Sequence, residues 1–312
     1  MPICPSRPAH PFAFATIALS GSVDAERLRR GRERLALLGS HIDDGIDATA
    51  QWRYFAGDDG QRLTSLHRAL ASGADVVLFA RGGYGLSRLL GRIDWDDVAA
   101  SRKVFCGYSD VTAFSLAALA RANFVTFAGP VSAGEFAQTE NEDARNFAER
   151  HFVALLSSDR YVYPIATSDV DHGHGAVGGT LWGTNLAMIT HLVGTPFMPQ
   201  INDGILLLED IGEAPYRVER MFWQLKHAGI LDRQRAIILG AFTDCEPAAS
   251  MRYPYSLAEA IETLREIAPC PVLTGFPFGH IPAKVTLPMG AAAEIAISGP
   301  QYTLAVRDYF SR

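Results

Sequence analysis

Cysteine is scarce in this sequence, and long apolar runs are missing. The four cysteines are Cys4, Cys106, Cys245 and Cys270. They form no CxxC pair and show no spacing typical of a disulfide framework or a zinc site. No stretch reaches the roughly 18 consecutive apolar residues of a membrane-spanning helix, because Arg121 and Asn123 interrupt the best candidate. These absences predict a soluble protein of the reducing cytoplasm that has no membrane partner.

Basic residues do not outnumber acidic ones, and they form no local cluster. Lysine and arginine together number 28 against 34 aspartates and glutamates, which gives a formal net charge of -6 and a pI near 5.8. A nucleic-acid-binding surface needs a concentration of positive charge to contact phosphates. We therefore expect no nucleic-acid partner.

The sequence does contain a large apolar fraction, arranged in short runs. Hydrophobic residues make up 48% of its 312 residues, which is enough to bury a large core and, at this length, favours two domains. In the first half, short apolar runs such as DVVLFA and KVFCG alternate with amphipathic ones. This alternation is typical of a parallel sheet with helices on both faces, and it predicts an α/β fold of the Rossmann or flavodoxin-like type.

Local signals predict the first elements of this fold. The run PFAFATIAL is expected to be a core strand, since prolines surround it and it makes a poor secretion signal. The amphipathic run at residues 24–39 predicts a helix, with Ser22 as its N-cap and Gly39 at its end. Gly73 is expected to end a second helix, and the run LSRLLGRI at residues 86–93 is expected to form another.

The pattern weakens between residues 157 and 178, where Asp, His, Gly and Ser are frequent. We place a domain boundary there, with an N-terminal α/β domain at residues 1–165 and a smaller mixed α/β domain at residues 166–312. His172 and His174 lie in this stretch and suggest a metal site. Two histidines in a glycine-rich loop without a third ligand seldom bind a metal, so solvated loop histidines are the simpler interpretation.

One serine stands where a predicted strand meets a predicted helix, in KVFCGYSDVTAF at residues 103–114. As a helix N-cap, Ser109 would accept a hydrogen bond from an amide of the first turn. As a nucleophile, it would lie on a tight strand-to-helix turn, with Gly107 allowing the bend and the helix amides facing an incoming carbonyl. The neighbouring Cys106 is expected to be a small buried core residue rather than a nucleophile.

Two further polar residues follow apolar strands, at the sheet edge where α/β proteins present catalytic groups. Glu209 ends ILLLE, where a carboxylate can orient an imidazole; a helix cap or an ion pair is the simpler role. His280 follows the rigid turn GFPFG, which would aim its ring as general base catalysis requires. The chain order Ser109, Glu209, His280 matches one known triad order. However, GYSDV lacks the last glycine of GxSxG and the residues span two predicted domains, so an ordinary α/β-hydrolase is disfavoured.

A glycine-rich stretch, ARGGYGLSRLL, follows the predicted strand DVVLFA. It matches neither GxGxxG nor GxxxxGK[ST]. Its exposed amides can stabilise an oxyanion, with glycine letting the backbone approach a substrate closely. A simple tight turn is the alternative.

Several motifs together resemble one family. They are ARGGYGLSRLL, GYSDVTAF, GTLWGTNLAMI, GTPFMP, ILLLEDIGEAPYRVERM, and FGH followed by VTLPMGA. In their order and over most of the chain, they resemble the LD-carboxypeptidases, the muramoyltetrapeptide carboxypeptidases of bacteria. The sequence departs from the family in having ALS where members often have APS after the first strand, and in its N-terminal MPICPSRPAHP.

The resemblance implies a serine peptidase that removes the terminal D-Ala from murein tetrapeptides during cell-wall recycling in the cytoplasm. It implies a homodimer that uses no metal and no cofactor. It also implies that Ser109, His280 and Glu209 form the catalytic triad, and that the backbone amides of Gly83 and Asp110 form the oxyanion hole.

A carboxypeptidase must recognise a free terminal carboxylate, and we therefore expect a cation near the triad. The candidates are Arg81, Arg217 and Lys284. Trp182 is expected either to line the cleft or to pack in the core. Two alternative functions stay open: an immunity-type peptidase of the same family that cleaves aminoacyl-nucleotide or acyl-sulfamoyl conjugates, and a non-catalytic two-domain module that binds a small ligand.

Overall fold

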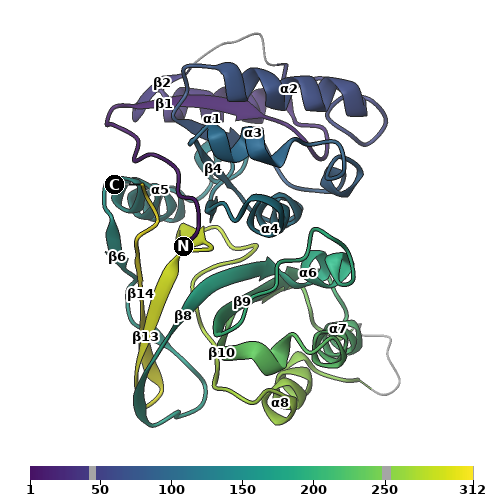
Figure 1. Cartoon of the computed structure of the whole chain (residues 1–312), viewed down its shortest axis with the longest axis vertical. Coiled ribbons are helices and arrows are strands. Elements are labelled where there is room, and N and C mark those ends of the chain that lie inside the picture. The colour runs from purple at the N-terminus through teal and green to yellow at the C-terminus, as the bar shows by residue number, and fades with distance from the viewer. Residues whose placement is uncertain (42–46, 248–253, 312) are drawn as a thin grey trace.

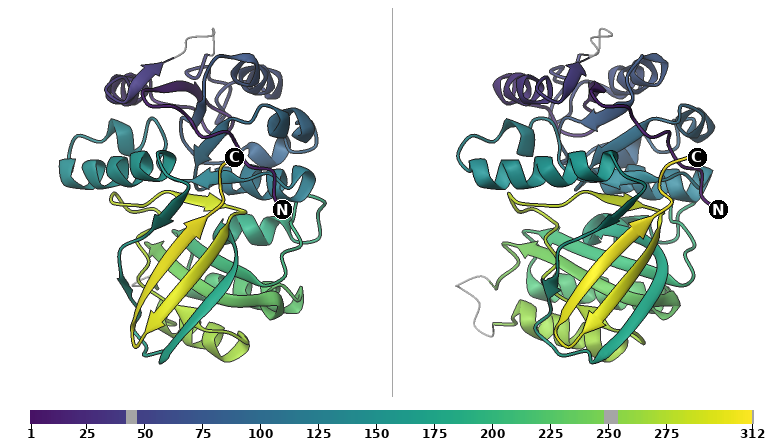
Figure 2. Two further views of the ribbon diagram at one scale, coloured as in Figure 1. Left: turned by 60° about the vertical axis from the view of Figure 1, so that its left-hand side comes forward. Right: turned by 90° about the vertical axis from the view of Figure 1, so that its left-hand side faces the viewer.

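The structure is a computed structural model that describes residues 1–41, 47–247 and 254–311. The chain forms two β-sheets with helices packed around them (Figure 1). The N-terminal half occupies the upper part of the view and most of the C-terminal half the lower part. Figure 2 shows that the N-terminus and the C-terminus lie near one another, beside the junction of the two parts.

The first sheet has six strands in the order β12-β5-β4-β3-β1-β2. Their bounds are β1 Phe12–Ile17, β2 Gly39–His41, β3 Val76–Phe79, β4 Val104–Gly107, β5 Thr126–Ala128 and β12 Leu287–Met289. The five N-terminal strands are mutually parallel, and β12 is antiparallel to β5. The strand order 2-1-3-4-5 is that of the flavodoxin-like folds. The predicted fold class of this half is therefore confirmed.

The helices of this half differ from the predicted ones in two places. They are α1 Ala25–Leu35, α2 Asp59–Ala71, α3 Trp95–Ala100, α4 Val111–Ala122 and α5 Glu142–Leu156, with the 3-10 turns η1 Leu86–Arg88 and η2 Glu135–Ala137. The N-cap of α1 is Asp24, whose carboxylate accepts from the Arg27 amide, so the prediction of Ser22 was wrong. The helix ends at Leu35, and Gly39 begins β2 instead. Residues 86–93 form only the short η1 and turns, not a full helix.

The second sheet has eight strands, in the order β11-β10-β9-β8-β13-β14-β6, with β7 also pairing to β14. The bounds are β6 Arg160–Val162, β7 Ala166–Thr167, β8 His174–Asn185, β9 Gly204–Ile211, β10 Gln234–Thr243, β11 Val272–Leu273, β13 Ala292–Ser298 and β14 Gln301–Arg307. Strands β8 to β11 are parallel, and the remaining pairs are antiparallel. The helices are α6 Leu186–Leu192, α7 Pro215–His227, η3 Leu231–Arg233 and α8 Leu257–Ile267. This is the expected mixed α/β arrangement, although its sheet has more strands than the first.

The two sheets exchange a strand in each direction. Strand β6 lies before residue 166 in the chain but joins the second sheet through β14. Strand β12 lies late in the chain but joins the first sheet through β5. The division into domains at residue 165 stays a prediction, and the crossing strands tie the two halves together.

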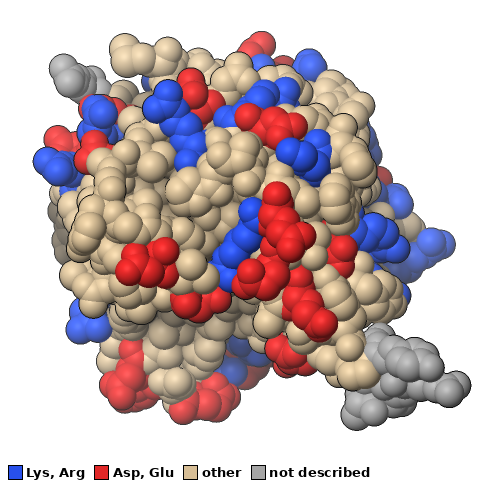
Figure 3. All heavy atoms as spheres, turned by 90° about the horizontal axis from the view of Figure 1, so that it is seen from below, with Lys and Arg blue, Asp and Glu red and all other residues tan. Residues whose placement is uncertain are grey.

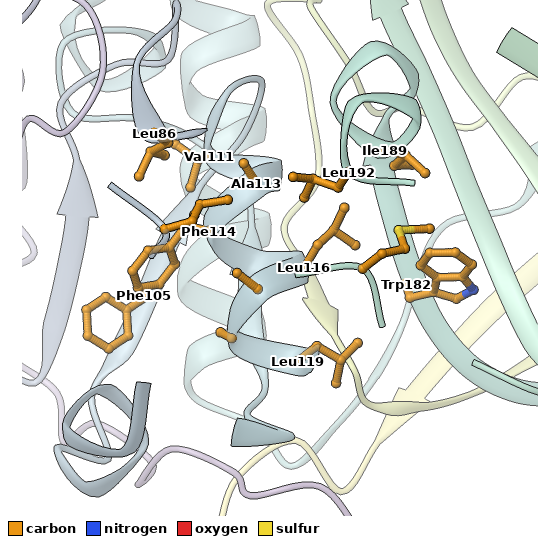
Figure 4. Packing of buried hydrophobic residues seen from close by; sticks show 14 of the residues in the cluster. Leu86, Phe105, Val111, Ala113, Phe114, Leu116, Leu119, Trp182, Ile189 and Leu192 are labelled. Carbon is orange, nitrogen blue, oxygen red and sulfur yellow. The ribbon is translucent and has the colours of Figure 1, made fainter. Parts of the chain in front are cut away.

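Helix α4 lies between the two halves and is buried on nearly all sides (Figure 4). Its sequence, VTAFSLAALARA, has a single charge, and a helix that is apolar all round belongs in a core. Phe114 packs against Phe105, with ring centroids 5.3 Å apart, on the side of the first sheet. On the other side, Leu116 and Leu119 face Trp182 of β8 within the same buried cluster. Because Ser109 lies just before this helix, the core fixes the direction of that turn.

The outer surface carries charges of both signs. On the face seen in Figure 3, acidic and basic side chains are interspersed. Across the described residues, no helix combines the length and the apolar character that crossing a membrane requires.

Candidate active site

Ser109 lies on a strained turn between β4 and α4. Its φ is +65°, a left-handed conformation that a non-glycine residue rarely adopts. The N-cap position of α4 belongs to Asp110, and no side chain of the described residues caps the first turn. The N-cap interpretation of Ser109 is therefore not supported. A strained residue held by packed structure on both sides is typical of a functional turn.

The glycine-rich loop after β3 approaches this turn closely. A Cβ atom added at Gly82 would lie 2.7 Å from the Ser109 Cβ and 3.0 Å from its Oγ. Gly107 has a similar constraint, because a Cβ there would lie 3.0 Å from the Phe79 Cβ. Glycine at these positions lets two loops meet around the serine hydroxyl.

His280 and Glu209 form a hydrogen-bonded pair. The His280 Nδ1 lies 2.8 Å from the Glu209 Oε2. Glu209 is fully buried inside β9, two residues before the strand ends, and the His280 side chain is 14% exposed. Since an ionised carboxylate only accepts hydrogen bonds, the Nδ1 carries the hydrogen and the Nε2 is left able to accept a proton. This is the arrangement of a general base held by a carboxylate.

The backbone before His280 is also constrained. Gly279 has φ +129°, and a Cβ atom there would lie 3.0 Å from the Ala241 carbonyl oxygen and 3.2 Å from the Glu209 Cβ. The His280 carbonyl in turn accepts a hydrogen bond of 3.0 Å from the Thr243 hydroxyl. The rigid turn that the sequence predicted therefore holds the imidazole against β9 and β10.

Ser109 and His280 line one pocket of about 470 Å³. The pocket lies at the carboxyl ends of β3 and β4, where open α/β sheets bind their ligands. Its walls include Gly82 and Gly83, the side chain of Tyr108, and two arginines described below. The structure thus brings together a serine, an imidazole and a buried carboxylate that lie far apart in the sequence.

Protein-family models match both halves of the chain. Residues 14–129 match the LD-carboxypeptidase N-terminal domain, and residues 178–295 match the LD-carboxypeptidase C-terminal domain. The chain belongs to the LD-carboxypeptidase family. The resemblance seen in the sequence motifs is confirmed.

Individual members of the LD-carboxypeptidase family cover nearly the whole chain. The murein tetrapeptide carboxypeptidase of Pseudomonas aeruginosa is 33% identical, over 89% of this chain and 91% of its own length. The microcin C7 self-immunity protein MccF of Escherichia coli is 30% identical, over 92% and 94%. The crystal structure of the muramoyltetrapeptide carboxypeptidase from Oxalobacter formigenes matches with a TM-score of 0.87 and 35% identity, covering 96% of this chain and 100% of that one.

The predicted oxyanion residues of this LD-carboxypeptidase-family chain lie at or beside the Ser109 turn. Gly83 lines the pocket with φ +107°. The buried Asp110 carboxylate accepts from the Ser20 hydroxyl at 2.6 Å and from the Leu86 amide at 3.0 Å. Burial raises the pKa of Asp110 despite these hydrogen bonds. Its side chain therefore ties the Ser109 turn to the glycine-rich loop, while the oxyanion role of the two amides stays a prediction.

Of the three predicted carboxylate-binding cations, only Arg81 lines the pocket. It is exposed, and its Nη1 donates to the Ser22 carbonyl at 3.0 Å. Arg217 is also exposed, at the start of α7, but it does not line the pocket. Its Nη1 lies 3.8 Å from the Glu213 Oε2. Lys284 is fully buried in an ion pair with Glu135, which leaves it no path to a substrate in this conformation.

Sequence reasoning missed a second pocket cation, Arg27. It lies on α1, lines the pocket, and donates from its Nε to the Ala133 carbonyl at 3.0 Å. Its helix contains many arginines, and no local signal separates the one that faces the pocket from those that face solvent.

Trp182 packs in the core and does not line the pocket. It is 1% exposed, and its Nε1 donates to the Gln234 Oε1 at 2.9 Å. Of the two roles predicted for it, the structure therefore supports core packing.

The other nucleophile and ligand candidates lie away from reactive positions. Cys106 is fully buried in β4, and burial raises the pKa of its thiol well above the usual value. The His172 Nε2 lies 3.3 Å from the Ser168 hydroxyl, and His174 is exposed at the start of β8. In the described ranges, no three His, Cys, Asp or Glu side chains are grouped so that they could hold a metal ion.

Proposed function

We propose that this protein is a serine-type L,D-carboxypeptidase that removes the terminal D-Ala from murein tetrapeptides, in peptidoglycan recycling in the cytoplasm. The observation that carries the proposal is the hydrogen bond between Glu209 and His280, whose imidazole lines one pocket with the strained Ser109. The family and the murein-specific names of its relatives supply the substrate class. The homodimer implied by the resemblance is part of the proposal.

The geometry supports a two-step acyl transfer. The Ser109 Oγ attacks the carbonyl of the bond to D-Ala, and the His280 Nε2 takes the serine proton. Glu209 holds the imidazole and stabilises its charged form. The proton then passes to the leaving amine of D-Ala, and a water molecule, activated by the same imidazole, hydrolyses the acyl-enzyme. Amides at Gly83 and Asp110 would stabilise the oxyanion of each step.

The charge of the pocket suits a substrate with a free C-terminus. Arg27 and Arg81 both line the pocket, and their positive charges attract a carboxylate. Guanidinium groups bind carboxylates through paired hydrogen bonds. Asp24, also in the lining, is the cap of α1 and accepts from the Arg27 amide. We infer that the two arginines hold the terminal carboxylate of D-Ala.

One relative supports a second candidate function. The microcin C7 self-immunity protein is 30% identical to this chain over most of its length. The alternative is therefore a peptidase of the same triad that cleaves aminoacyl-nucleotide or acyl-sulfamoyl conjugates. The third possibility, a non-catalytic binding module, leaves the buried carboxylate behind His280 without a role.

The test is a substrate panel with product masses. The protein is incubated with a murein tetrapeptide, a murein pentapeptide and an aminoacyl-sulfamoyl adenosine, and products are identified by mass. We expect D-Ala to be released from the tetrapeptide alone, and Ser109→Ala to abolish its release. Cleavage of the nucleotide conjugate alone would support the alternative, and cleavage of no compound would contradict both.

A further inference from the structure

A buried ionic cluster lies directly behind the pocket. The Lys284 Nζ lies 2.5 Å from the Glu135 Oε1, and the two side chains are 0% and 7% exposed. The Tyr108 hydroxyl donates to the same oxygen at 3.0 Å, and the Val131 amide donates to the Glu135 Oε2 at 3.0 Å. The Lys284 Nζ also lies 3.4 Å from the centre of the Tyr108 ring. Lys284, Glu135 and Tyr108 are called the buried cluster below.

The buried cluster joins the three segments that build the pocket. Tyr108 immediately precedes Ser109, and its ring centroid lies 5.0 Å from that of His280. Lys284 follows His280 in the same loop between β11 and β12. Glu135 follows the pocket residues Val131, Ala133 and Gly134. One ammonium group therefore bridges the loop of the general base, the nucleophile turn and the pocket wall.

The buried cluster contains one of the few lysines of the sequence, and burial acts on the pKa of both of its charged groups. Lysine occurs only at positions 103, 226 and 284 of the sequence. Burial lowers the pKa of Lys284, against the attraction of Glu135. Burial alone would raise the pKa of Glu135, but Lys284 and the hydrogen bonds outweigh it and lower that pKa.

A buried ion pair is a poor source of stability. Desolvating two charges costs about as much as their attraction returns, and apolar replacements of similar volume are often as stable. In some proteins such a pair instead fixes one geometry, because each charge is satisfied only when the partner segment is in place. At this site the defined geometry is that of His280 relative to Ser109.

We propose that Lys284 is a positioning residue that, through Glu135 and Tyr108, holds the His280 loop in register with the Ser109 turn. The inference rests on the proposed function, in which these two residues act together. Lys284 itself does not touch the substrate, because its side chain is fully buried. Loss of its charge should therefore slow the chemical step and leave substrate binding nearly unchanged.

The test measures the reactivity of Ser109 without a murein substrate. A fluorophosphonate probe forms a bond between the serine Oγ and phosphorus and releases fluoride, while His280 takes the serine proton. Lys284→Met keeps an unbranched side chain, one atom shorter, and removes its charge. We expect the labelling rate and kcat to fall roughly 10- to 100-fold, since small misplacements of reacting groups have effects of this size. We expect KM for the tetrapeptide to change by less than about threefold, because the groups that bind the substrate are unchanged.

Three further variants keep the test decisive. Lys103→Met is the matched control, because Lys103 is a buried lysine far from the pocket whose Nζ donates to the Ser72 and Ala74 carbonyls. It should lower the melting temperature without changing the labelling rate of the folded protein. If Lys284→Met fails to fold, Glu135→Gln takes its place with the same expected loss. The double variant should be no slower than the single ones, because the two residues act as a unit.

The outcomes separate the two proposals. If wild type labels at Ser109 and Lys284→Met or Glu135→Gln labels equally fast, the positioning role is overturned while the nucleophile stands. If KM rises and kcat stays constant, Lys284 acts on binding and the inference is also overturned. If wild type does not label at Ser109 at all, the proposed function itself fails.

Discussion

The His280 Nδ1 lies 2.8 Å from the Glu209 Oε2, although the two residues are 71 positions apart in the chain. Parallel pairing creates this contact: β9, β10 and β11 lie side by side, so residues at and beyond their carboxyl ends meet at one edge of the sheet. The neighbouring Gly279 lets the histidine loop approach β9 closely.

Gly279→Ala should therefore damage the pair without unfolding the protein. Its φ of +129° is unfavourable for alanine, and the new Cβ would press on the Ala241 carbonyl and on Glu209. We expect kcat to fall about 100-fold, as for other small displacements of catalytic groups. Gly299→Ala is the control, since Gly299 has φ +64° but its nearest neighbour would be an Asp171 oxygen 3.7 Å away. It should lose some stability and keep full activity, and equal activities of the two variants would refute the role of Gly279.

The strain at Ser109 predicts an order of stabilities. With φ at +65°, alanine at this position keeps the left-handed strain and glycine removes it. Ser109→Gly should therefore be more stable than Ser109→Ala by roughly 1 kcal/mol in urea unfolding, and both should lose turnover by several orders of magnitude. Asn123, with φ +49° at the end of α4, is the control position: Asn123→Gly should be more stable than Asn123→Ala, and both should stay active. An alanine variant as stable as the glycine variant would show that Ser109 is not strained in solution.

Arg27→Met should weaken recognition of the terminal carboxylate. A hydrogen bond between charged groups contributes roughly 1.5–3 kcal/mol, which corresponds to an increase in KM of about 10- to 150-fold. Arg29→Met on the same helix is the control, because Arg29 faces Glu26 and Glu33 and does not line the pocket. Steady-state rates on the tetrapeptide check this, and an unchanged KM would exclude Arg27 from carboxylate binding.

Asp210, next to Glu209, predicts a pH dependence of stability. Burial raises its pKa from 3.8 to about 6, in spite of hydrogen bonds from the Ile211 and Ala187 amides and the Asn185 amide group. The folded state then holds the proton more tightly than the unfolded state. The tighter binding of this proton by the folded state contributes fully to the free energy of unfolding below pH 3.8. This contribution is lost as the pH rises through about 6.

The measurement compares wild type with Asp210→Asn in urea between pH 4 and pH 7. The free energy of unfolding of wild type relative to the variant should fall by roughly 2 kcal/mol over this range. Asparagine does not titrate, so carboxylates that do not interact with Asp210 cancel in the difference. A difference that stays constant with pH would contradict the raised pKa.

The sequence predicted the elements whose signals are local. The buried helix α4 follows from nine consecutive residues without a charge, Val111 to Leu119, and β3 and β4 follow from short apolar runs between turns. The three triad candidates were found because each stands where an apolar strand gives way to a turn. Their spatial meeting could not be derived locally, and only the family resemblance indicated it.

Other features depend on tertiary contacts. Ser22 and Asp24 are both good N-caps, and only the position of the first helical turn decides between them. The run at residues 86–93 has helical periodicity, but the Leu86 amide donates to the Asp110 carboxylate, and the segment forms only a 3-10 turn. Lys284 was a candidate for carboxylate binding because its partner Glu135 is 149 positions away and no local signal indicates their ion pair.

In the proposed function, the pocket binds a free terminal carboxylate and a D-alanine methyl together, and Ser109 attacks the bond beside them. The direct measurement compares mass-resolved cleavage rates of a murein tetrapeptide ending in D-Ala, its C-terminal amide and its L-Ala epimer. We predict cleavage of the first alone. The amide should lose about 1.5 to 3 kcal/mol of binding because the charged hydrogen bonds to the carboxylate are gone. The epimer should lose about a hundredfold in rate because its scissile carbonyl is displaced. Equal cleavage of all three would contradict the carboxypeptidase function, even if Ser109 proves to be the nucleophile.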